Sequence, residues 1–155
     1  MLVRIARQSH LGDPEGCAAI LNMLATSRLV RGHLHSVLQH LGLTEAKLAT
    51  LVTLYALDPE PASPADLSVQ TQVSRASMTE LIETLHARSW ITRKPSPSDR
   101  RTQHLRLTEK GRTFVESAVR PFLIAVGHCA DVLTPAEYHL ITQTCARLCT
   151  HLKTA

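Results

Sequence analysis

The sequence predicts a mainly α-helical protein that contains one small antiparallel β-hairpin. Apolar residues recur at helical spacing in several segments, which begin at Ser, Thr or Asp caps, often followed by proline. Around residues 90–107 the pattern changes to the alternation of a strand pair, with a proline-containing turn between the two runs. A chain of 155 residues is one domain by length, so residues 1–155 are treated as a single folded unit.

Composition favours a folded protein of the cytoplasm. Hydrophobic residues at 44% against charged residues at 19% are typical of a globular domain rather than a disordered chain. No apolar run approaches the roughly 20 residues of a membrane-spanning helix. Asp13 and Glu15 interrupt the N-terminus before a secretory signal could form. We therefore expect a cytoplasmic protein with no membrane partner.

The first helix is predicted to begin at Asp13 and to continue to about His40. Asp13 is the N-cap, Pro14 lies in the first turn, and Gly42 ends the segment. The second half of this helix carries apolar residues at the spacing of one buried stripe, namely Val30, Leu34, Val37, Leu38 and Leu41.

Two shorter helices are predicted next. Thr44 is the N-cap of the first, which ends at Asp58-Pro59-Glu60-Pro61 because proline cannot continue a helix. Ser63-Pro64 begins the second, which ends near Thr71. The inner face of the helix after Thr44 is predicted to consist of Leu48, Leu51, Val52 and Tyr55.

A tight connection then leads to a fourth helix, for which Ser74 is the N-cap. Its apolar stripe is Met78, Leu81, Ile82 and Leu85. Two short helices joined by a tight turn, the second with a single apolar stripe, match the geometry of a helix-turn-helix. We therefore predict that the fourth helix is the recognition helix of a DNA-binding unit.

The hairpin that follows is the most basic part of the chain. Its strands are predicted at 90–93 and 104–107, joined by a long turn that begins at Pro95. From Arg88 to Arg106 there are six basic residues and one acid, which gives +5 in a chain whose formal charge is +4. The acid, Asp99, can pair with Arg101 and direct its guanidinium at a phosphate or a narrow minor groove. Residues 44–107 are thus predicted to form a winged helix-turn-helix.

Two long helices complete the chain. Thr108 offers an N-cap to a helix that is expected to run to about residue 132 and to be interrupted or bent by Pro121 and Gly127. Thr134-Pro135 begins the last helix. One side of the last helix is apolar and carries Leu140, Ile141, Cys145, Leu148 and Leu152.

The terminal helices have more apolar surface than a small DNA reader needs. We therefore predict that 14–42 and 109–153 are N- and C-terminal dimerisation helices that flank the winged helix-turn-helix. A two-fold dimer would present two recognition helices to half-sites one DNA turn apart.

This order of elements resembles the MarR family of bacterial winged-helix transcription regulators. The matching segments are Val73-Ser74-Arg75-Ala76-Ser77-Met78-Thr79, Leu85-His86-Ala87-Arg88-Ser89-Trp90-Ile91-Thr92-Arg93, and the wing from Asp99-Arg100-Arg101 to Leu107-Thr108-Glu109-Lys110-Gly111. The resemblance covers about residues 18–152. It implies a homodimer that represses genes and releases DNA when a small aromatic or phenolic effector, or an oxidant, acts on it.

The resemblance also implies which residues meet DNA. Ser74, Arg75, Ser77 and Thr79 fall on the N-terminal part of the recognition helix, and Asp99, Arg100 and Arg101 fall on the wing tip. Arg93 and Lys94, at the start of the hairpin, complete the predicted DNA-binding set.

Three residues depart from the family pattern. Glu80 stands where family members often carry a basic residue, and Glu83 follows one turn later. Acids on a DNA-facing surface either contact cytosine amino groups or lower the affinity for the operator. Ser89 replaces a common glycine, so either the turn before the wing needs no positive φ or Ser89 bears strain.

Analogy with the family places an effector pocket in a cleft between the dimerisation and DNA-binding regions. The residues expected to line it are His33, Val37, Leu54, Tyr55, Phe114 and Ala118.

The cysteines and histidines predict neither a disulfide framework nor a metal site. Four cysteines without CxxC spacing are most simply buried thiols, and Cys17, near the N-terminus, is the one most reachable by an oxidant. His33 and His35 are two residues apart and face different directions on a helix, which argues against a chelate. No metal or other cofactor is expected.

The leading hypothesis is a dimeric, sequence-specific regulator of double-stranded DNA, a repressor released by a small effector. Two alternatives stay open: a winged-helix protein-interaction module without operator recognition, motivated by Glu80 and Glu83, and a redox-sensing regulator that acts through cysteine. An enzyme is not expected, because the chain has no glycine-rich phosphate loop, nucleophile elbow or zinc-protease motif.

Overall fold

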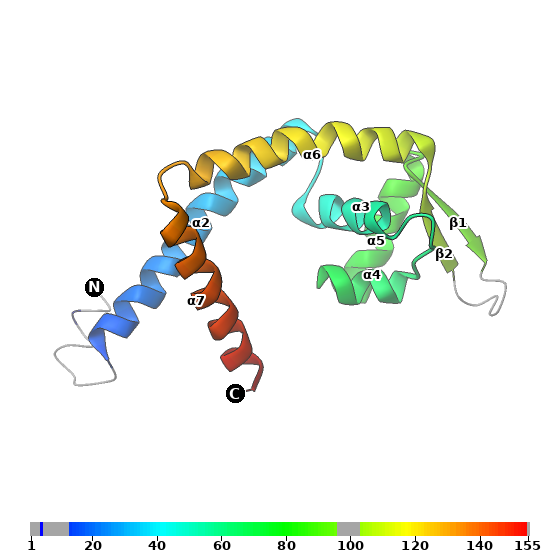
Figure 1. The fold of residues 1–155 in the computed structure, drawn as a ribbon. Helices are drawn as coiled ribbons and strands as arrows, with labels where there is room; N and C mark the ends of the chain where they lie inside the picture. The colour runs from blue at the N-terminus through cyan, green and yellow to red at the C-terminus, as the bar shows by residue number, and fades with distance from the viewer. Residues whose placement is uncertain (1–3, 5–12, 96–102, 155) are drawn as a thin grey trace.

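The predicted fold class is confirmed. The computed structural model describes residues 4, 13–95 and 103–154 and contains long helices around one two-stranded antiparallel sheet (Figure 1). In chain order the elements are α2 (Pro14–His40), α3 (Glu45–Leu57), α4 (Pro64–Thr71), α5 (Arg75–Ala87), β1 (Ile91–Pro95), β2 (Gln103–Leu107), α6 (Glu109–Ala130) and α7 (Pro135–Thr154).

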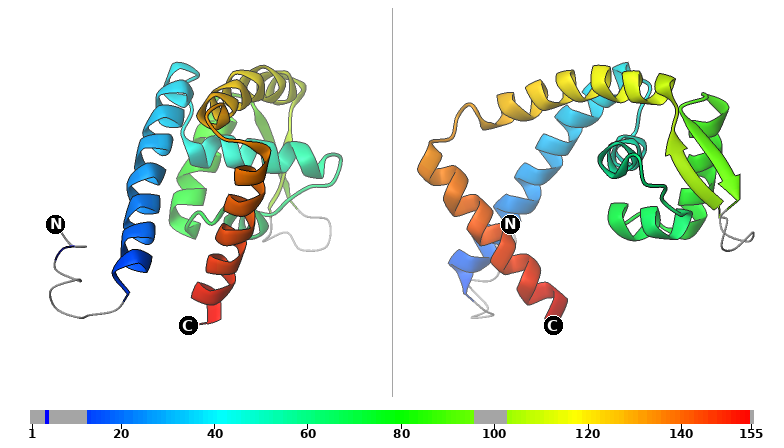
Figure 2. Two further views of the ribbon diagram at one scale, coloured as in Figure 1. Left: turned by 60° about the vertical axis from the view of Figure 1, so that its left-hand side comes forward. Right: turned by 45° about the vertical axis from the view of Figure 1, so that its right-hand side comes forward.

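The elements separate into two regions. α3, α4, α5 and the β1–β2 hairpin pack together, and we call this unit, residues 45–95 and 103–107, the hairpin lobe. α6 starts at the hairpin lobe and leads away from it, packing against α2 on the way (Figure 1). α7 then projects from the far end of α6, and the rotated views of Figure 2 agree on this arrangement.

The hydrophobic core lies in the hairpin lobe and under α6. The predicted apolar stripe of α5 is buried as expected, and Leu85 in that stripe is 0% exposed. Leu51 of α3, Leu67 of α4 and Leu105 of β2 are equally inaccessible, and Leu38 of α2 joins them from outside the lobe. Burial of each such leucine contributes on the order of 2 kcal/mol to folding.

The predicted inner face of α3 is wrong in part. Leu48 and Leu51 are buried, but Val52 and Tyr55 are 39% and 36% exposed, and Leu54 is 2% exposed. α3 contacts α4, α5, β2 and α6 at once, so its buried surface is wider than one stripe and is turned toward Leu54. Val52 and Tyr55 consequently lie on the side of α3 that faces the length of α6.

The helix starts are fixed by the side chains that the sequence predicted. Asp13, Thr44 and Ser74 each accept hydrogen bonds from backbone N–H groups in the first turn of α2, α3 and α5. Ser63 forms a reciprocal capping box with Asp66 at the start of α4. Hydrogen bonds from Ser63 also lower the pKa of the Asp66 carboxyl.

The hairpin is extended by one further contact. β1 and β2 pair with Ile91 opposite Leu107 and Arg93 opposite Leu105. Ala62, in the segment between α3 and α4, forms an antiparallel bridge with Leu105 on the other edge of β2. This bridge ties β2 of the hairpin to the segment that connects α3 and α4.

The sequence left open whether Pro121 and Gly127 interrupt or bend the helix after Thr108. Both residues lie inside one helix that continues to Ala130, so α6 is not interrupted. A proline in a helix interior removes one intrahelical hydrogen bond, and the remaining ladder holds the two halves in register. Figure 1 shows a single, gently curved helix.

The hairpin and α6 make a close backbone contact where they join. Thr108 caps α6 by accepting from the Gly111 N–H at 2.9 Å, and its hydroxyl donates to the Ser89 carbonyl at 2.7 Å. Its own N–H donates to the Trp90 carbonyl at 3.0 Å. A Cβ at position 111 would overlap that same carbonyl oxygen, so the first turn of α6 needs glycine there. We call Ser89, Trp90, Thr108 and Gly111 the α6 junction.

Ser89 adopts a positive φ of 58° in this junction. Of the two possibilities for the residue that replaces glycine, the strained one is therefore correct. The hydrogen bond from Thr108 to the Ser89 carbonyl helps to hold that conformation.

We predict that Gly111→Ala destabilises the protein by about 2 kcal/mol, because the new methyl group has to displace the Trp90 carbonyl. Thermal unfolding at fixed protein concentration should show a melting temperature lower by roughly 4–8 °C. Gly127→Ala is the matched control, since no atom lies within 4 Å of a Cβ there. It should raise stability by about 0.5–1 kcal/mol, as alanine does in a helix interior. Equal effects of the two changes on stability would contradict the close contact of Gly111 with the Trp90 carbonyl.

Candidate nucleic-acid interface

The exposed face of α5 lies on the side of the helix opposite its buried apolar stripe. Opposite the buried stripe, at spacings of four, three and four residues, lie Ala76, Glu80, Glu83 and Ala87, all exposed. We call these four residues the outer stripe of α5. Two members are alanines, so Glu80 and Glu83 supply all the polar side-chain atoms of the outer stripe.

The predicted polar residues of α5 lie beside the outer stripe and are exposed. Ser74 accepts from the Ser77 N–H and donates its hydroxyl hydrogen to Ser77 Oγ at 2.9 Å. Thr79 donates its hydroxyl hydrogen to the Arg75 carbonyl at 3.1 Å. Their hydroxyl hydrogens are thus used within the helix. Arg75 has no side-chain hydrogen bond to any described residue, so its guanidinium is available.

Glu83 is paired with the wing. Arg93 Nη1 of β1 donates to Glu83 Oε1 at 2.6 Å, and the Arg93 side chain is only 19% exposed. Nε and Nη2 of Arg93 are buried without a hydrogen-bond partner among the described residues. This pair joins the recognition helix directly to the first strand of the hairpin.

The hydrogen bond from Arg93 lowers the pKa of the Glu83 carboxyl below its usual 4.5. A carboxyl with a lowered pKa stabilises the fold above its unfolded pKa, and this contribution is lost as the pH falls through the folded value. The Glu83–Arg93 pair is therefore intact at neutral pH. Glu83 repels DNA phosphates less than a free acid would, and Arg93 attracts them less than a free base would.

Some basic residues between Arg88 and Arg106 make contacts that hold the fold, and others are exposed on the surface. Arg88 lies over the Trp90 ring at 4.8 Å and donates to the Gly42 carbonyl at 3.2 Å. With Arg93 held by Glu83, two of the basic residues of this segment serve the fold. Lys94 and Arg106 are exposed and form no ion pair with any described residue.

One face of the hairpin gathers these free cations. Lys94 lies opposite His104, and Thr92 lies opposite Arg106, so all four side chains share the face away from Leu105. With Pro95 they line a shallow hollow of about 260 Å³. Lys94 was among the predicted DNA-binding residues, whereas His104 and Arg106 were not, although strand alternation places both on the polar face of the hairpin. The predicted wing-tip residues Asp99, Arg100 and Arg101 lie outside the described residues.

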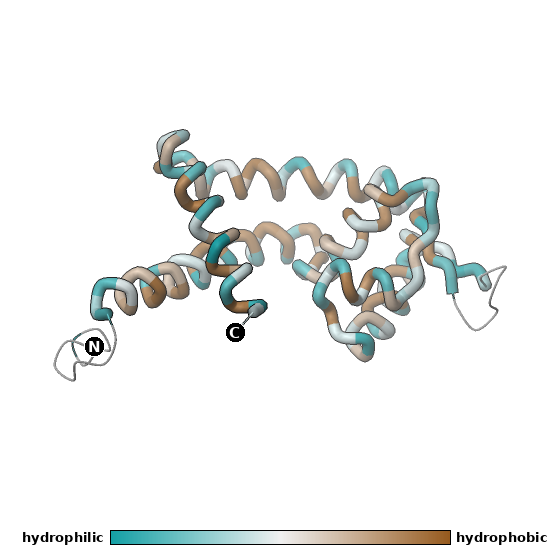
Figure 3. Tube along the Cα trace, turned by 60° about the horizontal axis from the view of Figure 1, so that its bottom comes forward, coloured by the Kyte–Doolittle hydropathy of each residue, from teal (hydrophilic) through white to brown (hydrophobic). Residues whose placement is uncertain are grey.

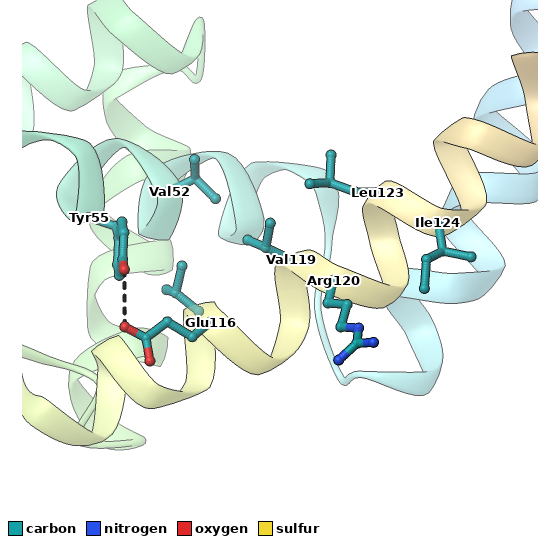
Figure 4. Close-up of a pocket in the computed structure, with 8 residues that line it drawn as sticks. Val52, Tyr55, Glu116, Val119, Arg120, Leu123 and Ile124 are labelled. Carbon is teal, nitrogen blue, oxygen red and sulfur yellow. Dashed lines mark hydrogen bonds between the residues drawn. The ribbon is translucent and has the colours of Figure 1, made fainter.

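A second feature is a cleft between α3 and α6 of about 750 Å³. Tyr55 donates its hydroxyl hydrogen to Glu116 Oε1 at 3.0 Å, which raises the pKa of the Tyr55 phenol (Figure 4). Arg112, which pairs with Asp58, stands 5.5 Å from the centre of the Tyr55 ring. The residues that line the cleft are Val52, Tyr55, Val115, Glu116, Val119, Arg120, Leu123 and Ile124.

The predicted effector-pocket residues do not meet in this cleft. Of the six, Tyr55 alone lines it. Leu54 and Ala118 are in the core at 2% and 1% exposure, and Phe114 stacks on Trp90 with ring centroids 3.8 Å apart. His33 is exposed on α2 and Val37 is half-buried there. The orientation of α3 explains the difference, because it turns Leu54 inward and Val52 toward α6.

The terminal helices leave apolar side chains uncovered. α7 has no buried residue, and large apolar side chains are exposed along α2 and α7. Figure 3 shows hydrophobic residues spaced along both helices. A groove of about 510 Å³ between α2 and α7 is lined by Met23, Thr26, Ser27, Val30, Arg31, Leu140, Ile141, Thr144 and Cys145.

The prediction of buried thiols does not hold within one chain. Cys145 and Cys149 are exposed, whereas Cys17 and Cys129 are partly buried. The reason is that the apolar side of α7 has no partner in the protomer. Within the described ranges, no three metal-ligating side chains gather. No helix in those ranges is long and apolar enough to cross a membrane.

Known proteins are similar to this chain in sequence and in fold. The transcriptional repressor MprA of Escherichia coli K12 is 30% identical, over 96% of this chain and 84% of its own length. A sequence model of the MarR family matches residues 41–102. The chain belongs to the MarR family. It is therefore a transcription regulator that binds DNA.

Two solved MarR-like structures extend the comparison. AbsC of Streptomyces coelicolor, a MarR family transcriptional regulator, superposes with a TM-score of 0.82 at 25% identity, covering 94% of this chain and 98% of AbsC. BpsR of Bordetella bronchiseptica, whose DNA binding is regulated by 6-hydroxynicotinic acid, gives a TM-score of 0.72 at 27% identity, covering 84% of this chain and 91% of BpsR.

Proposed function

We propose that this MarR-family protein is a homodimeric repressor that binds an inverted-repeat operator and leaves it when a small aromatic effector occupies the cleft between α3 and α6. The observation that carries the proposal is the pairing of an exposed α5 face with a basic hairpin in one lobe, joined by α6 to uncovered apolar helices. MprA, which is a repressor, supports the regulatory sense.

The dimer is supported by the apolar surface of α2 and α7. Side chains such as Leu140, Ile141 and Leu152 are 63%, 47% and 73% exposed in the single chain. Exposed apolar side chains gathered on one region indicate a protein–protein contact. A second copy of the chain would cover these residues, together with Cys145 and Cys149, and a two-fold axis would repeat the hairpin lobe at the second half-site.

We predict that Ile141→Glu disrupts the dimer, because it places a charge in the apolar groove between α2 and α7. Sedimentation equilibrium should give twice the chain mass for the unaltered protein and a concentration-dependent shift toward the single chain for the variant. Val69→Glu introduces the same charge on α4, at a site that is 79% exposed, and should leave the mass unchanged. An unaltered protein that sediments as a single chain would exclude the dimer.

DNA binding by the hairpin is proposed to be electrostatic. Lys94 and Arg106 are the cations of the polar hairpin face that pair with no described residue, and Arg100 and Arg101 of the wing tip extend the same charge along the sequence. Such residues contribute affinity without selecting a sequence, because phosphates carry no base identity.

We predict that the double change Lys94→Gln and Arg106→Gln weakens binding to all duplexes. The dependence of log K on log salt concentration should flatten by about 0.9 for each lost phosphate contact. Titration of a labelled duplex from the region upstream of the gene, by fluorescence anisotropy at several salt concentrations, measures both quantities. Changing Arg147 and Lys153 of α7 to Gln removes the same charge and should leave the slope unaltered.

Two results of this titration would count against the proposal. An unchanged slope in the hairpin variant would remove the hairpin from the interface. Failure of the unaltered protein to form a competitor-resistant complex at moderate salt would favour the alternative of a winged-helix protein-interaction module.

The effector site is proposed to be the cleft beside Tyr55. Its walls are mostly apolar, and Tyr55, Glu116 and Arg120 add a phenol, a carboxylate and a guanidinium. This combination suits a flat aromatic molecule with an acidic or phenolic group. Regulation of BpsR by 6-hydroxynicotinic acid supports an effector of that class.

We predict that a thermal-shift series of hydroxylated and carboxylated benzenes and pyridines contains a compound that raises the melting temperature. At 100 times its dissociation constant, a ligand that binds only the folded state adds about 2.7 kcal/mol, or roughly 5–11 °C for a chain of this size. Tyr55→Phe, which removes only the hydroxyl, should reduce the shift. A series without any shift would contradict the cleft as an effector site.

A further inference from the structure

We propose that Glu80 is a base-reading residue that selects a cytosine in each operator half-site. The inference rests on the proposed operator recognition and goes beyond it by assigning one base preference to one side chain. It concerns the centre of the exposed α5 face, where Ala76 and Glu80 lie one turn apart.

Geometry places Glu80 where base edges would be read. Glu80 is exposed and lies in the outer stripe of α5, directly opposite the buried residues that fix the helix to the core. Ala76, one turn earlier, has no polar group and is small enough to let the groove approach. Glu80 lies in the sixth position of a helix of 13 residues, within the half that a helix-turn-helix presents to the major groove.

Glu80 also differs from its neighbour Glu83 in what it contacts. Glu83 is held at 2.6 Å by Arg93, toward the hairpin. The Glu80 carboxylate forms no hydrogen bond or ion pair with any residue in 13–95 or 103–154. Only its backbone carbonyl is used, as the acceptor for the Thr84 hydroxyl at 3.0 Å. Glu80 is therefore the one acid of the outer stripe without a described partner.

The chemistry of the major groove then selects the base. A carboxylate only accepts hydrogen bonds at neutral pH. Guanine presents N7 and O6 acceptors, thymine presents the O4 acceptor, and adenine places its N7 acceptor beside its amino group. Cytosine offers the N4 amino donor alone, so it is the base that Glu80 can contact without facing an acceptor on that base.

The negative charge strengthens this selection. A carboxylate that enters the groove loses water and approaches phosphates. Guanine and thymine offer no donor that recovers this cost, and at adenine the amino donor stands beside the repelling N7 acceptor. Glu80 therefore acts by rejecting wrong bases as much as by binding the right one. Arg75, at the start of α5, does not compete for this base, because a guanidinium only donates hydrogen bonds and cannot contact the cytosine amino group.

Selection from a random duplex library tests the assignment. The unaltered protein should enrich a cytosine at one symmetric position in each half-site. Glu80→Gln should shift that position toward adenine, since glutamine donates to N7 and accepts from N6. Glu80→Ala should lose the preference there and keep the rest of the site. Glu15→Gln, the same charge change in the first turn of α2, should enrich the same site as the unaltered protein.

A binding cycle on the selected operator adds a second readout. Replacing the chosen C·G pair by T·A should weaken the unaltered protein roughly tenfold and should change Glu80→Ala by less than about twofold. A duplex in which that cytosine lacks its amino group should behave like the T·A duplex. Because Glu80 is exposed, unfolding midpoints of all variants should agree, which excludes a folding defect.

The outcomes distinguish failure of the role proposed for Glu80 from failure of operator recognition as a whole. If the unaltered protein enriches no sequence, operator recognition itself fails, and the role of Glu80 fails with it. If it enriches a site that Glu80→Ala also enriches, position by position, the assignment of Glu80 alone is overturned. A uniform gain in affinity for every duplex in Glu80→Ala would show that Glu80 only repels DNA, and would overturn the assignment as well.

Discussion

The structure depends on the contact between the start of α6 and the carbonyl of Trp90. Thr108 bonds both Ser89 and Trp90, and Gly111 removes the side chain that would keep α6 away. Stacking of Phe114 on Trp90 extends the contact by one turn of α6. The end of α5, the start of β1 and the start of α6 consequently meet at one point.

Within the hairpin lobe, the proposed sources of affinity and of selectivity for DNA lie on different elements. Arg88 and Arg93 are committed to Trp90 and Glu83, which leaves Lys94 and Arg106 on the open hairpin face. α5, by contrast, presents an acid at the middle of its outer stripe. In the proposed mode of binding, the hairpin supplies general attraction to DNA phosphates, and α5 supplies the selectivity for particular bases.

Much of this fold follows from the sequence because its signals are local. Asp13, Thr44, Ser63, Ser74 and Thr108 cap the helices as predicted, since a cap depends only on residues within one turn. Features that depend on distant partners were not predictable. Apolar spacing in α3 allowed Val52 and Tyr55 as the inner face, and only the simultaneous packing of four elements turns Leu54 inward. The Glu83–Arg93 pair joins a helix to a strand across a turn. Because Arg93 neutralises Glu83, this acid is less unfavourable for DNA binding than the sequence alone indicated.

The position of the cleft suggests how occupancy would reach DNA. It opens along α6 between two fixed regions, the α6 junction at one end and the contact of α6 with α2 at the other. A ligand that pushed α3 away from α6 there would change the angle between the hairpin lobe and the terminal helices, with the α6 junction as the pivot. Thermodynamic linkage makes the effect reciprocal: a ligand that lowers operator affinity by a given factor binds the operator complex more weakly by the same factor. A coupling of about 1–3 kcal/mol corresponds to a 5- to 150-fold change in operator affinity, which is the size of effect expected of the proposed effector.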